Sequence, residues 1–298
     1  MKRMRLKVDK KVDAILTADW HLQEKDPICR LDNFKDETQW RKVDFISDLQ
    51  KMFSCAVFHA GDLFDHWKPS PELLSMVAQH LPDNFISVYG NHDLPQHSLE
   101  LSHKCGLYNM MVNRKVTIPA SGNYGQSLKK GMQNFWVMGN PARKIAMQHI
   151  MTYQGKEPWP GCTDPKAAKI LRQFPDIDLI ITGDNHQSFV EQYKGRLLVN
   201  PGSIFRMDAD QIDFEPRVYL WHSEDNTVTP IYIPIEKNVI SREHLKLASD
   251  KKNRIDAFIS ALNTDWDVTL SFEENLMLFE KLNKVHPKVM KIVYSTVS

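Results

Sequence analysis

The sequence contains little cysteine, almost no net charge and no long hydrophobic run. The four cysteines stand far enough apart that none forms a CxxC pair, which excludes zinc-ribbon and thioredoxin-type sites. A net charge of +1 gives no general attraction for nucleic acid, although a local basic groove is compatible with it. A membrane-spanning helix needs about 18 apolar residues in succession, and no hydrophobic run approaches that length.

Further absences narrow the class of protein. The apolar stretch after the basic N-terminus, residues 14–16, is too short for a secretory signal, so we expect a cytoplasmic protein. The sequence has no phosphate-binding loop of the GxxxxGKS or GxxxxGKT form and no sustained heptad repeat, so the chain is neither a P-loop ATPase nor a coiled coil. Its 298 residues fit one large globular domain with a smaller appendage.

Hydrophobic patterning predicts strands that alternate with helices early in the chain and hairpins later. Apolar runs at 12–17, 55–59 and 85–89 predict buried strands, and helical spacing predicts helices over 38–53 and 71–81. Such alternation is typical of an α/β layered fold. Further strands are expected at 135–138, 144–150, 178–182, 196–199, 218–221 and 228–233, with a short helix at 167–174.

The character of the sequence changes at about residue 235. Segments 241–262 and 272–285 are charged and have helical periodicity. We therefore predict a main domain over residues 1–235 and a small α-rich C-terminal extension over residues 236–298, which caps the domain or docks a partner. Within the main domain, the glycine- and proline-rich residues 153–165 are predicted to form a loop.

Residues that can bind metal ions cluster at the ends of several predicted strands. Ligands of open α/β sheets bind beyond the carboxyl ends of the strands, so these clusters are expected to meet at one edge. Carboxylate, imidazole and amide groups together suit Mn, Fe or Zn better than Ca or a lone Mg, and the lack of a thiolate argues against a structural zinc site. The clusters are Asp19-Trp20-His21, Gly61-Asp62-Leu63-Phe64-Asp65, Gly90-Asn91-His92-Asp93, His149 and Gly183-Asp184-Asn185-His186.

In this order the clusters match DxH, GDxxD, GNHD, a lone histidine and GxxH, and over about residues 12–235 the chain thereby resembles the calcineurin-like metallophosphoesterases. DxH alone is a weak signal and GNHD is far more specific, so the order of the motifs after successive strands carries the resemblance. It implies an α/β fold in which two stacked sheets lie between helical layers, an α-β-β-α sandwich.

Residues beside the motifs narrow the resemblance to the SbcD-type DNA-repair nucleases. Pro69-Ser70-Pro71 follows GDxxD, Leu94-Pro95 follows GNHD, and residues 200–206 have the sequence NPGSIFR. Protein phosphatases of the superfamily usually continue GDxxD with Arg-Gly and have GNHE, whereas this chain has His66-Trp67 and Asp93. The resemblance implies a metal-dependent DNA exonuclease or endonuclease of repair, recombination or degradation, and the short chain fits a bacteriophage-encoded version.

The resemblance also implies a pair of divalent metal ions, with Mn expected ahead of Mg, Fe and Zn. Asp62 would bridge the two ions, because neighbouring cations need a shared anionic oxygen between them. A water molecule between the ions would attack phosphorus. One ion would be held by Asp19, His21, Asp62 and His186, and the other by Asp62, Asn91, His149 and Asp184.

Three more residues receive predicted roles. The resemblance implies that His92 protonates or stabilises the leaving oxygen, since an imidazole titrates near neutrality. Asp93 would orient His92, with a helix or turn cap as the alternative. Arg206 would contact a substrate phosphate, with a surface salt bridge as the alternative.

Two of the predicted ligands carry alternatives of their own. Asp184 stands where the family usually has the first histidine of Gly-His-x-His, and a carboxylate there favours Mn or Mg or weakens the second metal site. His149 is assigned by its position after the apolar residues 145–147, and a packed core histidine is its alternative.

The resemblance implies DNA as substrate, a homodimer, and a separate SbcC-type coiled-coil ATPase as partner, with no membrane contact. A phosphoesterase of small nucleotides or phosphoproteins is one alternative, and a non-catalytic scaffold on the same fold is another. An open basic groove would favour DNA, whereas a capped pocket would favour a small substrate.

Overall fold

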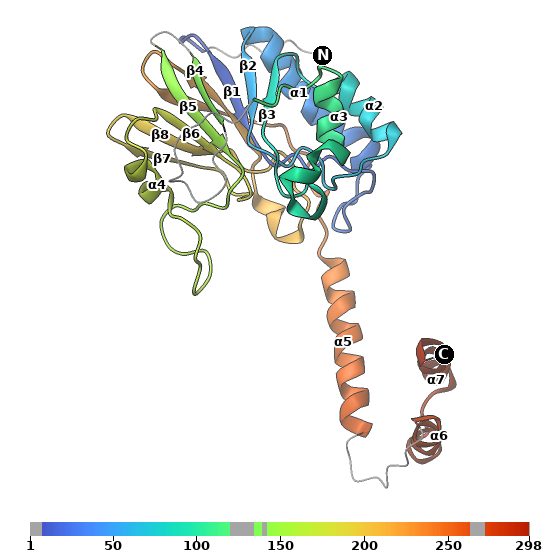
Figure 1. Cartoon of the computed structure of the whole chain (residues 1–298). Coiled ribbons are helices and arrows are strands. Elements are labelled where there is room, and N and C mark those ends of the chain that lie inside the picture. Colours follow the sequence, from blue (N-terminus) through green and yellow to red (C-terminus); the bar gives the residue numbers. More distant parts are fainter. Residues whose placement is uncertain (1–7, 120–133, 139–141, 263–271, 298) are drawn as a thin grey trace. The chain divides into compact units, whose positions relative to one another are not determined.

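The computed structural model describes residues 8–119, 134–138, 142–262 and 272–297, and its strands form two central sheets (Figure 1). The chain divides into two units, Met1–Ser241 and Arg242–Ser298. The sequence pattern predicted the boundary slightly earlier, between residues 235 and 236. The first unit contains both sheets and every predicted metal ligand.

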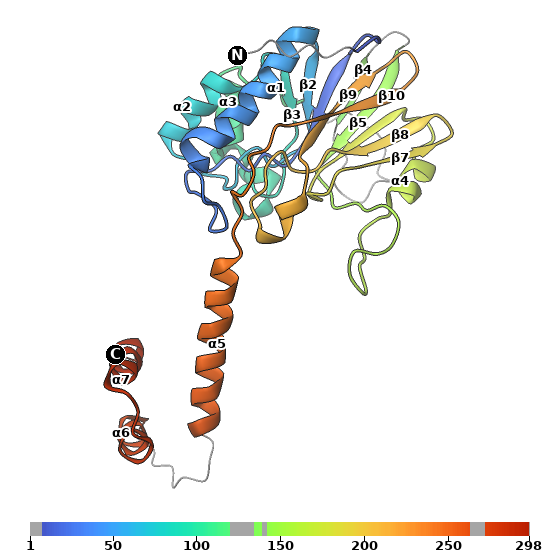
Figure 2. The same ribbon diagram turned by 180° about the vertical axis from the view of Figure 1, so that it is seen from behind.

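The first sheet has the strand order β10-β9-β1-β2-β3 in the described residues. Its three parallel strands are β1 (Ala14–Thr17), β2 (Ala56–His59) and β3 (Phe85–Ser87). The antiparallel hairpin of β9 (Arg217–His222) and β10 (Thr227–Tyr232) lies beside β1, as the view from behind in Figure 2 shows. Because β1, β2 and β3 run the same way, the residues that follow them emerge at one edge.

The second sheet has the order β4-β5-β6-β8-β7 in the same described part of the chain. Its central strands β5 (Arg143–Gln148), β6 (Leu179–Thr182) and β8 (Arg196–Asn200) are parallel. The edge strands β4 (Asn134–Met138) and β7 (Phe189–Tyr193) are antiparallel to their neighbours. Strand β7 was not predicted, because its central polar residues interrupt the hydrophobic pattern.

Helices cover the outer face of each sheet. Helices α1 (Gln39–Phe53), α2 (Pro71–His80) and α3 (Gly106–Val112) pack on the first sheet, and α4 (Ala167–Gln173) packs on the second. Side chains alternate along a strand. Ile15 therefore packs toward α1, whereas Leu16 packs between the sheets with Ile145. This order of layers confirms the predicted α-β-β-α sandwich.

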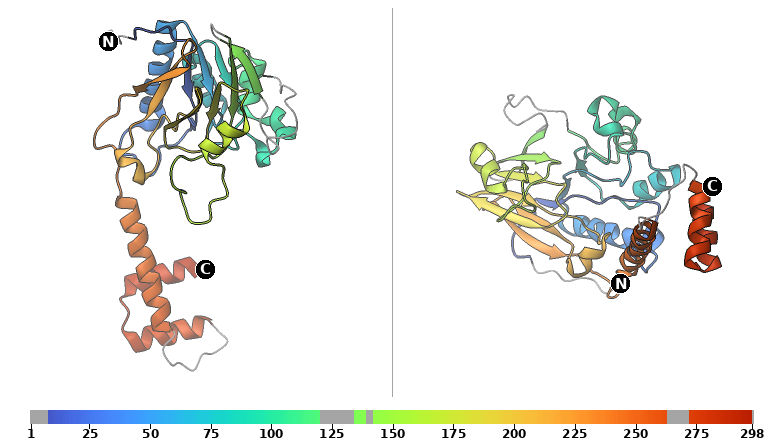
Figure 3. Two further views of the ribbon diagram at one scale, coloured as in Figure 1. Left: turned by 90° about the vertical axis from the view of Figure 1, so that its left-hand side faces the viewer. Right: turned by 90° about the horizontal axis from the view of Figure 1, so that it is seen from below.

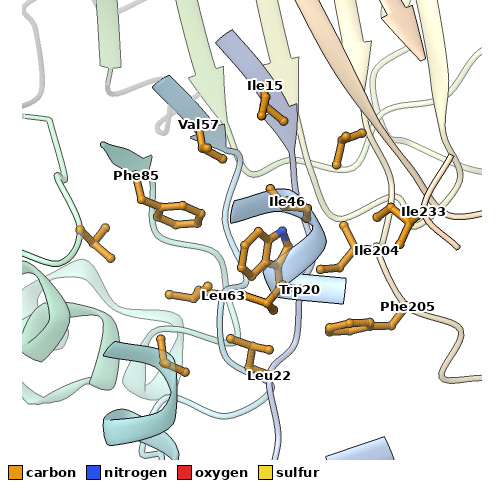
Figure 4. Packing of buried hydrophobic residues seen from close by; sticks show 14 of the residues in the cluster. Ile15, Trp20, Leu22, Ile46, Val57, Leu63, Phe85, Ile204, Phe205 and Ile233 are labelled. Carbon is orange, nitrogen blue, oxygen red and sulfur yellow. The ribbon is translucent and has the colours of Figure 1, made fainter. Parts of the chain in front are cut away.

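Trp20 anchors the loop that follows β1. Its indole is fully buried, donates from Nε1 to Thr17 Oγ1 at 2.7 Å, and meets the Phe85 ring edge-on at 5.2 Å between ring centroids. Figure 4 shows the indole at the centre of the core between the first sheet and α1. Asp19 and His21 flank this tryptophan, so core packing fixes the backbone of two predicted metal ligands.

The second unit is helical and consists of α5 (Glu243–Leu262), α6 (Phe272–Asn283) and α7 (Pro287–Val297) in its described part. The pattern predicted α5 and α6 but not α7. Leu276, Phe279 and Met290 are buried, while other large apolar side chains of these helices are exposed. None of the described helices in the chain combines the length and the apolar character needed to cross a membrane.

Candidate metal centre

The seven predicted metal ligands all follow the carboxyl ends of parallel strands. Asp19 and His21 come after β1, and Asp62 comes after β2. Asn91 follows β3, His149 follows β5, and both Asp184 and His186 follow β6. The structure brings the seven side chains to one place, where the edges of the two stacked sheets meet. Their roles as ligands stay a prediction, which the geometry of the donor atoms supports.

One group of donors consists of Asp19, His21 and His186, whose ligand atoms lie within 4.8 Å of one another. The Nε2 atoms of the two histidines are only 3.2 Å apart. Asp19 Oδ2 is buried and has no hydrogen-bond partner among the described residues. A buried polar atom without a partner is costly, so this group fits a cation that would satisfy it.

The second group is centred on His149. Its Nδ1–H donates to the carbonyl of Ala60 at 2.8 Å, so Nε2 faces the site. Three oxygen atoms face that nitrogen, from Asn91 (2.9 Å), Asp62 (3.1 Å) and Asp184 (3.7 Å). Oxygen atoms that converge in this way fit a cation. A metal-binding histidine usually donates its other ring N–H to a carbonyl or carboxylate, as His149 Nδ1 does here.

The electrostatics of the centre favour added positive charge. Burial alone would raise the pKa of Asp62, yet the hydrogen bond from His149 and the charges of His149 and His21 lower it to about 2. Burial likewise opposes protonation of His149, but Asp62 and Asp19 raise its pKa to about 10. Burial raises the pKa of Asp19. Carboxylates that hold a buried proton on an imidazole equally favour divalent cations at that position.

The backbone at the centre is strained. Asp19, His21, Asp62 and Asp184 have positive φ angles of 52°, 45°, 56° and 72°. Each such conformation costs on the order of 1–3 kcal/mol and is found mainly at functional sites. Gly90 allows the closest approach, because a Cβ atom there would lie 2.0 Å from Asp62 Oδ1. The sequence thus gives up stability to bring these groups together.

His92 lies at the exposed rim of the centre. Its backbone N–H donates to Asp62 Oδ1 at 2.9 Å, and its Nδ1 donates to the carbonyl oxygen of Asp65 at 2.7 Å. Its ring meets the His21 ring edge-on at 4.7 Å. The remaining nitrogen, Nε2, is therefore available to a bound substrate, as proton donation to a leaving oxygen requires.

The predicted role of Asp93 in orienting His92 is wrong. Asp93 is fully buried, and burial raises its pKa to about 6. Its carboxylate accepts backbone N–H groups from the loops that carry GDxxD and GNHD, and so acts as a clamp that holds the two loops together. The imidazole of His92 is oriented by the carbonyl of Asp65 instead. The donors are the N–H groups of Asp62 (3.0 Å), Leu63 (3.3 Å), Phe64 (3.1 Å) and Gly90 (3.0 Å).

The predicted contact of Arg206 with a substrate phosphate is also wrong. Only 4% of this residue is exposed. Its guanidinium donates to the carbonyls of Ile212 at 2.9 Å and Glu236 at 2.6 Å. The loop after β8 turns inward, so Arg206 fastens the end of the first unit to the core and does not reach the metal centre.

Two supporting residues lie in the motifs but received no role from the sequence. Asp65 lies in the GDxxD motif, and besides its carbonyl contact its Oδ1 is 3.6 Å from His21 Nδ1. Asn200 donates to the carbonyls of Asn185 at 2.5 Å and Gln187 at 2.8 Å, and so holds the loop that carries His186. The second aspartate of GDxxD and the NPGS sequence were the available signals.

The fold and the site together indicate the superfamily to which the chain belongs. The chain belongs to the calcineurin-like phosphoesterase superfamily, whose domain model matches residues 14–220. This fold binds divalent metal ions, and the donors described above fit them. Ions bound there would activate a water molecule and neutralise charge on a phosphoryl group. The class is therefore that of phosphoric ester hydrolases.

Among curated proteins the chain is similar to the DNA double-strand break repair protein Mre11 of Methanosarcina acetivorans, with 27% identity over 201 residues. The match covers 60% of this chain but only 31% of that relative. Among solved structures it is similar to an archaeal phosphodiesterase (TM-score 0.41, 14% identity, 74% of this chain and 98% of that one). Vps29 from Entamoeba histolytica gives a TM-score of 0.33 at 14% identity, covering 74% and 99%. At these values the solved structures assign no substrate.

Proposed function

We propose that this chain is a nuclease that hydrolyses phosphodiester bonds in DNA with two divalent metal ions, Mn first among them. The observation that carries the proposal is the convergence of oxygen and nitrogen donors from five strand ends, with His92 Nε2 directed to substrate at the rim. The likeness to Mre11, whose name specifies DNA double-strand break repair, supports DNA as the substrate. Asp184 is 40% exposed and His92 is exposed, which suits a polymer better than an enclosed small molecule.

Different residues of this chain would bind the metal ions and donate the proton. The seven ligands would hold the ions that activate water, and His92 would give its Nε2 proton to the leaving oxygen. The carbonyl of Asp65 accepts the Nδ1–H of His92 and so orients Nε2 toward the substrate, where the imidazolium form of the ring would release its second proton. Asp93 would act only through the loops that it ties together.

Digestion of end-labelled linear DNA by the purified chain with Mn²⁺ tests the proposal. His92→Ala should lower turnover by about 10²–10⁴-fold, the usual contribution of a positioned acid. Its metal content should stay at the wild-type level, because the imidazole is not among the seven ligands. Hydrolysis of a bis-aryl phosphate diester without DNA cleavage would overturn the DNA substrate. Absence of both activities in a metal-loaded chain would instead favour a scaffold.

We also propose that the chain forms a homodimer and that its second unit docks a separate coiled-coil ATPase of the SbcC type. Leu282 and Ile292 are 63% and 66% exposed, so apolar surface is available on α6 and α7. Removal of residues 245–298 should abolish co-purification with such an ATPase and leave bound Mn²⁺ unchanged. Loss of the metal as well would show that the segment serves folding and would count against a docking role.

A further inference from the structure

The loop between β5 and α4 presents a tryptophan to solvent. Trp159 is 47% exposed, whereas the other tryptophans with described side chains are buried or half-buried. Figures 1 and 3 show this yellow-green loop projecting beyond α4, away from the layers of the sandwich. Exposing a large indole forfeits about 1.5–3 kcal/mol of burial, so its position outside the core needs a reason. The other tryptophans are Trp20, Trp40, Trp67 and Trp221.

The backbone around Trp159 is stiff. The N–H of Cys162 donates to the carbonyl of Trp159 at 3.2 Å, and Gly161 has a φ angle of +80°. Residues 159–162 therefore match a type II β-turn, which favours proline at its second position, here Pro160, and glycine at its third, here Gly161. Pro158 restricts the chain on the other side of the indole. A side chain held in this way loses little entropy when it binds a partner.

The base of the loop is attached to the metal centre. The side chain of Asn185, which stands between the ligands Asp184 and His186, donates to the carbonyl of Thr152 at 2.6 Å. The backbones of Tyr153 and Lys166 pair in an isolated parallel β-bridge, which closes the loop. Tyr153 is four residues beyond His149, a span of at most roughly 14 Å. The base of the loop, with Tyr153 and Lys166, therefore lies close to the centre.

The surface of the loop combines aromatic and basic groups. A hollow of about 590 Å³ is lined by Tyr153, Lys156, Trp159 and Lys166, with Glu157 and the prolines completing it. Neither lysine lies within salt-bridge distance of a carboxylate in the described part of the chain. Aromatic faces that stack on bases, beside ammonium groups that pair with phosphates, form the usual platform for single-stranded nucleic acid.

We propose that this loop binds an unpaired end of the nucleic acid, with Trp159 stacked on a base and with Lys156 and Lys166 on the phosphates beside it. The inference rests on the proposed nuclease function and adds a single-stranded segment to the substrate. A short diester such as a bis-aryl phosphate carries no nucleobase and no second phosphate, so on this proposal its turnover does not need the loop. Comparing an oligonucleotide with a short diester therefore distinguishes binding by the loop from hydrolysis at the metal centre.

Binding is measured by the anisotropy of a fluorescent single-stranded oligonucleotide. Turnover of the oligonucleotide and of the bis-aryl diester is measured with Mn²⁺. Trp159→Ala should weaken oligonucleotide binding about tenfold to a hundredfold, the range expected for one stacked base, and raise KM accordingly. Its turnover of the bis-aryl diester should stay within about twofold of wild type. Trp159→Phe should restore most of the binding. Tyr232→Ala, at a 51% exposed aromatic on β10, is the matched control and should change neither.

The lysines give an independent readout. Lys156→Gln with Lys166→Gln should reduce the slope of log affinity against log salt by about 1.4, because each single-strand phosphate contact contributes about 0.7. Wild-type binding and salt slope in all loop variants would overturn the inference while leaving the nuclease proposal intact. Diester turnover without oligonucleotide binding or cleavage would overturn both. Weakened self-association in Trp159→Ala, with binding unchanged, would assign the indole to a protein contact.

Discussion

Asp62→Asn is expected to lower metal-dependent turnover by about a thousandfold or more while the chain still folds. The Oδ2 atom of Asp62 is 3.1 Å from His149 Nε2 and 3.6 Å from His21 Nε2, so this carboxylate lies between the two donor groups. A neutral amide cannot supply the anionic oxygen that two neighbouring cations share. Losing several kcal/mol of this stabilisation corresponds to the expected drop, at about 1.4 kcal/mol for each factor of ten.

Folding should survive, because asparagine keeps the Oδ1 atom that accepts the N–H of His92 at 2.9 Å. Metal analysis should find fewer than two Mn²⁺ ions per chain. The rise in Tm that Mn²⁺ gives the wild type, through binding to the folded state alone, should largely disappear. Asp83→Asn, at an exposed position, is the matched control. Two bound ions with wild-type turnover in Asp62→Asn would rule out the bridging role.

The placement of the seven predicted metal ligands at one edge could be foreseen because two local signals coincide in the sequence. Short apolar runs mark the buried parallel strands, and the ligands follow directly after them, as Asp62 follows β2 and Asp184 follows β6. Parallel strands deliver such residues to one edge whatever the details of packing. Even His149, assigned by position alone, lies in the cluster.

The direction of a side chain could not be predicted in the same way. Nothing local to Arg206 shows that the carbonyls of Ile212 and Glu236 come within reach of its guanidinium. The order of motifs likewise places Asp93 beside His92 without showing that its carboxylate points into the core. Helix α3 and strand β7 were missed for a related reason, since their hydrophobic periodicity is weak and tertiary contacts define them.

Asp93→Asn is expected to destabilise the first unit and weaken metal binding together. Oδ2 of Asp93 accepts three backbone N–H groups and Oδ1 accepts a fourth. An amide offers one oxygen, so in either orientation at least one buried N–H group faces an NH₂ group. A buried donor left unsatisfied costs about 1–3 kcal/mol, and we expect a loss of about 2–4 kcal/mol in the free energy of unfolding.

For a unit of this size that loss lowers Tm by roughly 5–15 °C, which thermal unfolding of metal-free protein would measure. Affinity for Mn²⁺ should fall about tenfold to a hundredfold, as for other groups that support metal ligands, because the clamp holds the backbone of Asp62. Asp48→Asn, on the exposed face of α1, should change neither quantity. Unchanged Tm and metal affinity, with a lowered kcat and a shifted pH profile, would instead show that Asp93 acts on the imidazole of His92.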